Sequence, residues 1–404
     1  MPASSPPAAA TGTYVPLWLL ALVTISGTLA MHMFVPALPD AARHFQADSA
    51  AVQGAITAYI AGLALGQLAY GPLSDALGRR PMLLAGLVLY VLGGLAAMLA
   101  PSVPLLVGAR LLQALGGCAG LALGRAMVRD THAPADAVRA LALLNLMMMV
   151  GPGLAPLVGS TLVALGGWRA VFALLTLLGA ATLLLVWRRV PETAQASGRL
   201  RPGRLARDYA VLLRSPRFVA YAVGGGCATT SVYAFIAAAP FIITGQLGRP
   251  LGDVGVSLAV IMLGLAAGSL LASRLAQRVG VGRLLLWGNG ISVASGALFL
   301  LLELTGWLTL VAAVGLMVCF VIGAGLASPA VLAKVLALDA RRVGSAVGLY
   351  GFVQMALGAV FSALVGWGGN PAMAAAVVLF GAALLGQGCL QFALLRSRAP
   401  GVRR

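Results

Sequence analysis

The residues of this chain that could do chemistry are a few polar side chains inside long apolar stretches. His32 and Arg110 each lie roughly 10 Å from one end of such a stretch, at 1.5 Å of helix per residue. Gln113 shares the helical face of Arg110. Since a charge at membrane depth is costly, it indicates a functional site by default. We therefore predict a water-filled cavity lined by His32, Arg110 and Gln113, in which His32 binds and releases a proton near neutral pH.

Two alternatives stand beside this prediction. Arg110 could be a structural tie to backbone carbonyls, and His32 could be a hydrogen-bonded packing residue. Further polar side chains that could line the same cavity, or be satisfied packing groups, are Tyr59, Asn145, Tyr233 and Gln354. The apolar stretches contain no central carboxylate. We expect Asp40 and Glu303, which lie at the ends of such stretches, to be solvated.

A second constellation is the segment GPLSDALGRRP (71–81), which connects two apolar runs. Gly78 permits a sharp turn and a close approach of helices. Arg79 and Arg80 favour the positively charged side of a membrane. Asp75 is placed to meet a helix N-terminus or an arginine. Together with Gly71, these residues predict a structured polar turn rather than an ordinary basic loop.

Composition excludes several classes of protein. Of 404 residues, 60% are hydrophobic and 9% are charged, whereas soluble proteins carry about 25% charged residues. The net charge of +17 comes from arginines in short loops, so it indicates anionic lipid rather than nucleic acid as the partner. Lys334 is the only lysine, and no Walker-type phosphate loop surrounds it. The three histidines and four cysteines are scattered, and no nucleophile–base or paired-carboxylate pattern occurs. We therefore expect no catalytic site, metal or cofactor.

About 20 apolar residues are needed to cross a bilayer, and twelve stretches qualify. They are approximately 14–38, 51–73, 82–100, 103–126, 138–164, 168–187, 218–243, 252–273, 282–304, 307–330, 343–366 and 373–395. If the spans alternate in direction, 23 of the 27 basic residues lie on one side and three on the other, with Arg110 inside a span. This asymmetry predicts that both termini are cytoplasmic.

The fold class expected is therefore an all-α membrane protein with twelve transmembrane helices in two six-helix bundles. The arginine-rich stretch 188–217 is the natural boundary between the halves. The predicted parts are a disordered tail (1–13), a first bundle (14–187), a cytoplasmic linker (188–217), a second bundle (218–395) and a cytoplasmic tail (396–404).

The fifth predicted span contains GPGLAPLVG (151–159). Its small residues Gly151, Ala155 and Gly159 form one smooth stripe that permits close helix packing. Pro152 and Pro156 each remove a backbone hydrogen bond and predict a bend. Such a helix suits a bundle that must rock.

Four of these stretches together resemble one family. The segment at 71–81 resembles the signature loop between helices 2 and 3 of the major facilitator superfamily. RLLQALGG (110–117) resembles the helix 4 motif of its proton-coupled members. The stretch at 151–159 resembles the antiporter motif, with Met147 where a first glycine is usual, and GWRAVF (167–172) follows in its expected place. VPALP (35–39) resembles the end of helix 1 in the bicyclomycin-resistance (Bcr/CflA) subfamily, which usually has Asp where this chain has His32.

The resemblance implies a monomeric transporter of the bacterial inner membrane that exports small amphipathic drug-like molecules in exchange for protons by alternating access. It also implies that Asp130 pairs with Arg79 and closes a cytoplasmic gate around Asp75. Because a histidine replaces the usual acid, the proton site can differ from that of relatives. Export of a metabolite such as a sugar or nucleoside is the alternative, and a channel or membrane enzyme is less favoured.

Overall fold

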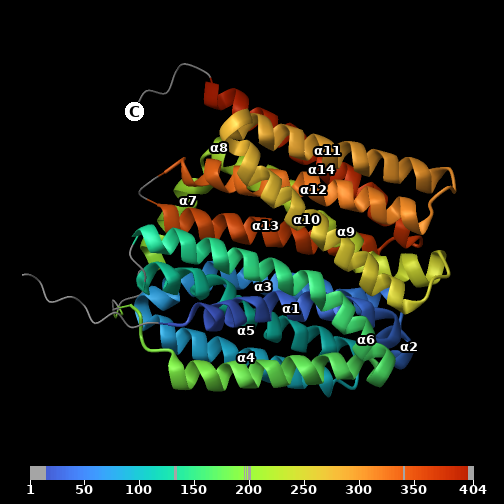
Figure 1. The fold of residues 1–404 in the computed structure, drawn as a ribbon, viewed down its shortest axis with the longest axis horizontal. Helices are drawn as coiled ribbons and strands as arrows, with labels where there is room; N and C mark the ends of the chain where they lie inside the picture. Colours follow the sequence, from blue (N-terminus) through green and yellow to red (C-terminus); the bar gives the residue numbers. More distant parts are fainter. Residues whose placement is uncertain are drawn as a thin grey trace, which may run out of the picture.

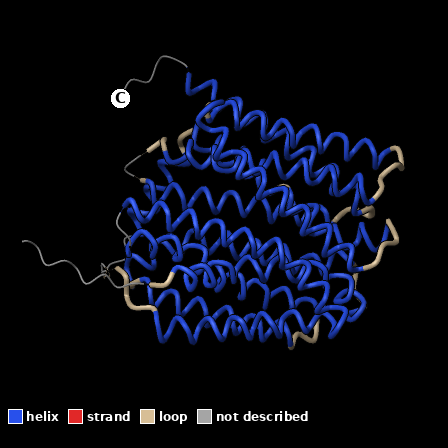
Figure 2. The backbone as a smooth tube through the Cα atoms, viewed as in Figure 1, coloured by secondary structure: helices blue, strands red, loops and turns tan. Residues whose placement is uncertain are grey.

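The computed structural model describes residues 15–131, 134–194, 196, 198, 202–339 and 342–398, and these are almost entirely helical (Figure 2). The elements in chain order are α1 (Leu17–Phe34), η1 (Val35–Ala37), α2 (Leu38–Phe45), α3 (Ser49–Leu77), α4 (Arg79–Met98), α5 (Val103–Thr131), α6 (Pro134–Arg189), α7 (Pro202–Leu213), α8 (Pro216–Thr230), α9 (Val232–Phe241), η2 (Ile242–Gln246), α10 (Leu251–Val279), α11 (Val281–Leu304), α12 (Leu310–Leu336), α13 (Val343–Gly366) and α14 (Pro371–Arg398).

Eleven helical segments of the described chain are long and apolar enough to cross a membrane. One of them, Gly151–Arg189, has 39 residues, about 58 Å of helix, which is nearly twice the hydrocarbon thickness of a bilayer. It breaks at Gly167, whose φ of +71° is outside the helical region. Glycine adopts this conformation without steric cost. The break separates two antiparallel spans, so the protein has twelve transmembrane helices.

The helices form two six-helix bundles that lie side by side, α1–α6 and α8–α14 (Figure 1). In the first, α1 and α2 make one span and α6 makes two; in the second, α8, α9 and η2 make one span. α3 packs on α13, and α6 packs on α10. In the first contact the hydroxyls of Thr57 and Ser362 are 3.1 Å apart, and in the second Gly255 approaches the carbonyl of Pro156. We call the end of the molecule at which α7 lies the linker end.

The helices extend beyond the predicted spans. α3 continues to Leu77 and α5 to Thr131, because backbone hydrogen bonding does not stop where the apolar stretch stops. The first span is followed by a 3₁₀ turn and α2, which ends at Phe45 rather than near residue 38. Within the predicted linker, α7 forms at Pro202–Leu213. The predicted tail 1–13 lies outside the described residues, and α14 reaches into the predicted C-terminal tail as far as Arg398.

Candidate functional site

Arg110 is a residue of α5, and its side chain is enclosed by α1, α3 and α6 in the first bundle. Its side chain has no exposed surface. Nη1 donates to Oε1 of Gln113 at 2.6 Å, and Nη2 donates to the carbonyl oxygen of Ala30 at 3.1 Å. A guanidinium can make both bonds at once because its donors are fixed in a planar fork. The side chain therefore bridges two helices without a carboxylate partner.

Aromatic rings complete the enclosure of this charge. The guanidinium carbon lies 4.0 Å from the ring centroid of Tyr59, 5.1 Å from that of Phe34 and 5.6 Å from that of Phe172. The Tyr59 hydroxyl donates to the carbonyl oxygen of Gly27 at 2.6 Å, so α3 is joined to the same face of α1. Ring faces attract a cation most strongly when water is excluded. Sequence reasoning missed Phe34 and Phe172, since phenylalanines in apolar stretches carry no signal of their own.

The water-filled cavity lined by His32, Arg110 and Gln113 stays a prediction, and in the conformation described these three side chains are buried. Arg110 and Gln113 are 0% exposed and His32 is 6% exposed. The guanidinium of Arg110 donates to a backbone carbonyl of the neighbouring helix α1, which is the contact that the alternative of a structural tie predicts. Arg110 Nε and Gln113 Nε2 are buried without hydrogen-bond partners, so the arrangement leaves donors available for a different state.

His32 does not join the arginine cluster. His32 follows Ala30 by two residues, and at 100° per residue the two side chains point about 160° apart around the axis of α1. Arg110 binds the carbonyl of Ala30, so His32 lies on the other side of the helix. Its Nδ1 lies 2.9 Å from the carbonyl oxygen of Thr28. Because a carbonyl only accepts, Nδ1 carries the hydrogen and the lone pair of the neutral ring is on Nε2. Nε2 is thus the atom that could take up a further proton.

The second bundle brings two predicted cavity residues near each other. Gln354 Nε2 donates to the Thr229 hydroxyl at 2.7 Å, and Thr230 donates to the Gln354 carbonyl at 2.9 Å. The ring of Tyr233 stands against Gly358, where a Cβ would be 2.7 Å from it. These contacts join α8 and α9 to α13. Asn145 lies on α6, and its side chain is outside the described residues.

At the linker end, the side chain of Arg79 contacts several polar residues of the turn and of α5. Its Nε lies 3.1 Å from Oδ2 of Asp130, and its Nη1 lies 2.6 Å from Oδ1 of Asp75 and also contacts the Ser74 hydroxyl. The side chain of Asp75 is 64% exposed and that of Arg79 is 14% exposed. Arg80 Nη2 donates to the Trp187 carbonyl at 2.8 Å. Gly71 is an ordinary helical position with open space around its Cα.

The helix N-terminus at this turn is capped by Glu192 rather than by Asp75. Oε1 of Glu192 accepts from the backbone N–H of Arg79 at 2.8 Å, and Oε2 accepts from that of Arg80 at 3.2 Å. Gly78, with φ +101°, lets the chain turn beside this carboxylate, and a Cβ there would be 2.5 Å from Oε2. A carboxylate at a helix N-terminus satisfies free donors and complements the helix dipole. Sequence analysis missed Glu192, although an acid after Pro191 at the end of a span was visible.

At the opposite end, Asp40 is not simply solvated as predicted. Its Oδ2 accepts from the backbone N–H of Trp168 at 2.9 Å and so caps the helix that starts after Gly167. Arg169 donates to the carbonyls of Met98 and Ala100 at 3.1 and 3.3 Å. Glu303 accepts from Asn370 at 2.9 Å. Among the described residues, no group of three His, Cys, Asp or Glu could hold a metal ion.

The stripe of small residues on α6 packs against α1. A Cβ at Gly151 would be 2.6 Å from Ile25 Cγ2, and one at Gly159 would overlap the Met33 carbonyl. Ala155 is fully buried. Pro152 and Pro156 lie inside a helix whose only non-helical dihedrals are at Gly167. The predicted stripe is therefore a packing surface between two helices of the same bundle.

Two six-helix bundles in a membrane, with an enclosed intramembrane arginine and an ionic network at one end, define a secondary-transporter fold. Residues 20–363 match the family model of the Major Facilitator Superfamily, and the chain belongs to this family. A solved D-xylose-proton symporter has the same fold, with a TM-score of 0.74 at 13% identity over 93% of this chain and 96% of its own.

Curated relatives include drug transporters. The chain is 31% identical to the multidrug transporter MdfA of Escherichia coli O6:H1 over 83% of this chain and 82% of that protein. It is 27% identical to a bicyclomycin resistance protein homolog of Haemophilus influenzae, covering 87% and 89%. It is 29% identical to YdgK of Bacillus subtilis, described as an uncharacterized MFS-type transporter, covering 91% and 92%. The resemblance to bacterial drug-efflux proteins is thus confirmed.

Proposed function

We propose that this chain exports small amphipathic drug-like molecules across the bacterial inner membrane in exchange for protons. The names of the multidrug and bicyclomycin-resistance relatives support the substrate class. The excess of basic residues at the linker end supports cytoplasmic termini. A single chain has both bundles, so we take the monomer as the transport unit.

The observation that carries this proposal is the enclosed Arg110. A charge buried at membrane depth is costly and indicates a functional site by default. Here it holds α1 against α5 through Ala30 and Gln113. A change in the position of α1 would break this bridge. Arg110 therefore stabilises the present position of α1, the helix that also contains His32.

Proton coupling is assigned to His32 because the ten acidic residues of the chain lie near the ends of the transmembrane helices, in loops or, for Asp208, in the linker helix α7. With Nδ1 donating to Thr28, Nε2 takes the proton and α1 gains a positive charge. That charge in a poorly hydrated site favours the state in which His32 is open to water. It also disfavours a bound cationic substrate, so proton uptake and substrate release are linked.

The network of Arg79 serves as the cytoplasmic gate. Asp75, Asp130 and Glu192 hold the ends of α3, α4, α5 and α6 together while the linker end is arranged as in this structure. Opening and closing of the two bundles then moves this end as one unit. Tyr59, Asn145, Tyr233, Gln354 and the stripe of α6 are proposed to border the substrate path in the state that opens.

Everted membrane vesicles test the proposal directly. Ethidium uptake should follow an imposed pH gradient, should stop when nigericin collapses it, and should lose its pH dependence in His32→Gln. His44→Gln, a change to the exposed histidine of α2, serves as the matched control and should keep it. Gradient-independent flux would refute antiport, and a gradient-driven protein that moves sugars but no organic cation would favour the metabolite alternative.

A further inference from the structure

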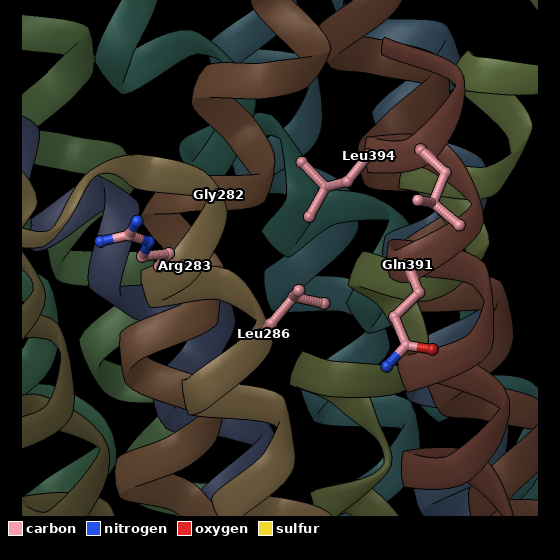
Figure 3. Close-up of a pocket in the computed structure, with 6 residues that line it drawn as sticks. Gly282, Arg283, Leu286, Gln391 and Leu394 are labelled. Atoms are coloured by element: carbon pink, nitrogen blue, oxygen red, sulfur yellow. The ribbon is translucent and has the colours of Figure 1, made fainter. Parts of the chain in front are cut away.

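A groove of about 210 Å³ lies between α11 and α14 at the linker end of the second bundle. The residues that line it are Gly282, Arg283, Leu286, Gln391, Leu394 and Leu395. In Figure 3, Leu286 and Leu394 face the same space, with Arg283 on the α11 side and Gln391 on the α14 side. A Cβ at Gly282 would stand 3.3 Å from Leu394 Cδ2, so the glycine keeps this space open.

Arginines gather at the end of the bundle where the groove lies, and one of them, Arg283, lines it. Arg283 is exposed, and Arg217 reaches the end of α14 by donating to the carbonyl oxygen of Arg396. The guanidinium carbon of Arg396 lies 4.9 Å from the ring centroid of Phe392. In the part of the chain that the structure describes, no carboxylate forms an ion pair with these three arginines. Their charge is therefore left for an external anion.

The groove also opens where lipid is expected. Arg283, Gln391 and Leu395 are exposed. Trp287, next to Leu286, has 58% of its surface exposed. Tryptophan is enriched at the level of lipid headgroups. An occupant at this place needs an apolar part for the leucines and an anionic part for the arginines, and basic pockets between transmembrane helices bind such headgroups.

We propose that this groove is a site for one anionic phospholipid of the inner leaflet. An acyl chain lies between Leu286 and Leu394, and the phosphate pairs with Arg283 on the α11 side of the groove. The lipid joins α11 to α14 at the end where their side chains leave a gap. The site is in the bundle that lacks Arg110, so the inference is independent of the proposed proton and substrate path.

Native mass spectrometry of the full chain in detergent tests the site. The protein is titrated with phosphatidylglycerol and, separately, with phosphatidylcholine of the same acyl chains. The wild type should retain phosphatidylglycerol more tightly. Arg283→Gln should weaken that binding about fivefold, from the loss of one cationic side chain near a headgroup. Arg274→Gln removes an exposed arginine from the linker end of α10 and should leave binding unchanged.

A second variant changes the space inside the groove without changing its charge. Gly282→Leu keeps every arginine but fills the space beside Leu394, so it should reduce binding of both lipids. Thermal unfolding of each variant checks that the fold is retained. Equal affinity for the two lipids would overturn the proposed recognition of charge. Wild-type binding of phosphatidylglycerol by either Arg283→Gln or Gly282→Leu would overturn the site.

Discussion

Replacing Arg110 separates its structural contribution from its role in transport. In Arg110→Lys the charge remains, but a single ammonium cannot reproduce the planar fork that reaches both Ala30 and Gln113. Loss of one charge-assisted hydrogen bond costs about 1.5–3 kcal/mol, or a tenfold to hundredfold change in an equilibrium. We expect this loss of free energy to shift the equilibrium between the transporter's conformations, and so to slow transport tenfold to hundredfold.

Arg110→Met removes both bonds and the contact with Tyr59. Gln113 Oε1, left without this donor, costs about 1–3 kcal/mol, whereas the Ala30 carbonyl keeps its bond within α1; removal of the buried charge offsets this cost. We therefore expect the free energy of unfolding to change by only about 2 kcal/mol, while transport is lost.

The assay compares ethidium transport per molecule of protein in vesicles with thermal unfolding of the purified variants. Arg43→Met is the matched control, because Arg43 is exposed and its pair with Asp40 is worth at most about 1 kcal/mol. Wild-type transport by a well-folded Arg110→Met protein would refute the reasoning, since the arginine would then be a packing element only.

Three further predictions concern the linker end and the topology. Asp75→Asn should abolish transport with nearly normal abundance, because Asp75 is largely exposed and its pair with Arg79 adds little stability; active, abundant protein would contradict the gate. Glu192→Gln should destabilise the start of α4 by about 1 kcal/mol, measured by thermal unfolding, since an amide cannot accept with both side-chain atoms; an unchanged melting temperature would argue against the cap. In a cysteine-free background, Arg207→Cys should react with a membrane-impermeant maleimide only from the cytoplasm and Gly369→Cys only from the periplasm, and labelling of both from one side would reject the topology.

Sequence and structure agree where the signal is local. The break between the fifth and sixth spans was predicted near 165–167, because a glycine followed by a new apolar run is visible without any partner. The turn at Gly78 was predicted for the same reason, and its φ of +101° is one that glycine alone adopts easily. The packing stripe of Gly151, Ala155 and Gly159 follows directly from helical periodicity.

The sequence does not say which of the predicted cavity residues contact each other. The prediction placed His32 and Arg110 in one space because their depths match, but depth does not specify the direction of a side chain around a helix axis. α1 presents Ala30 to Arg110 and turns His32 elsewhere. The same limitation applies to Asp40, whose role as a cap depends on Trp168, 128 positions further along the chain.

The sequence by itself determined that this protein has twelve apolar spans in two halves with an asymmetric distribution of arginines. Each span is recognised from its own length and composition, because the bilayer requires about 20 apolar residues whatever their neighbours are. Only the tertiary structure decided which groups meet. Glu192 caps α4 across 113 positions, and Arg110 binds a carbonyl 80 positions away. Backbone carbonyls and N–H groups are the same at every residue, so the helix that supplies the partner is known only when the bundle is assembled.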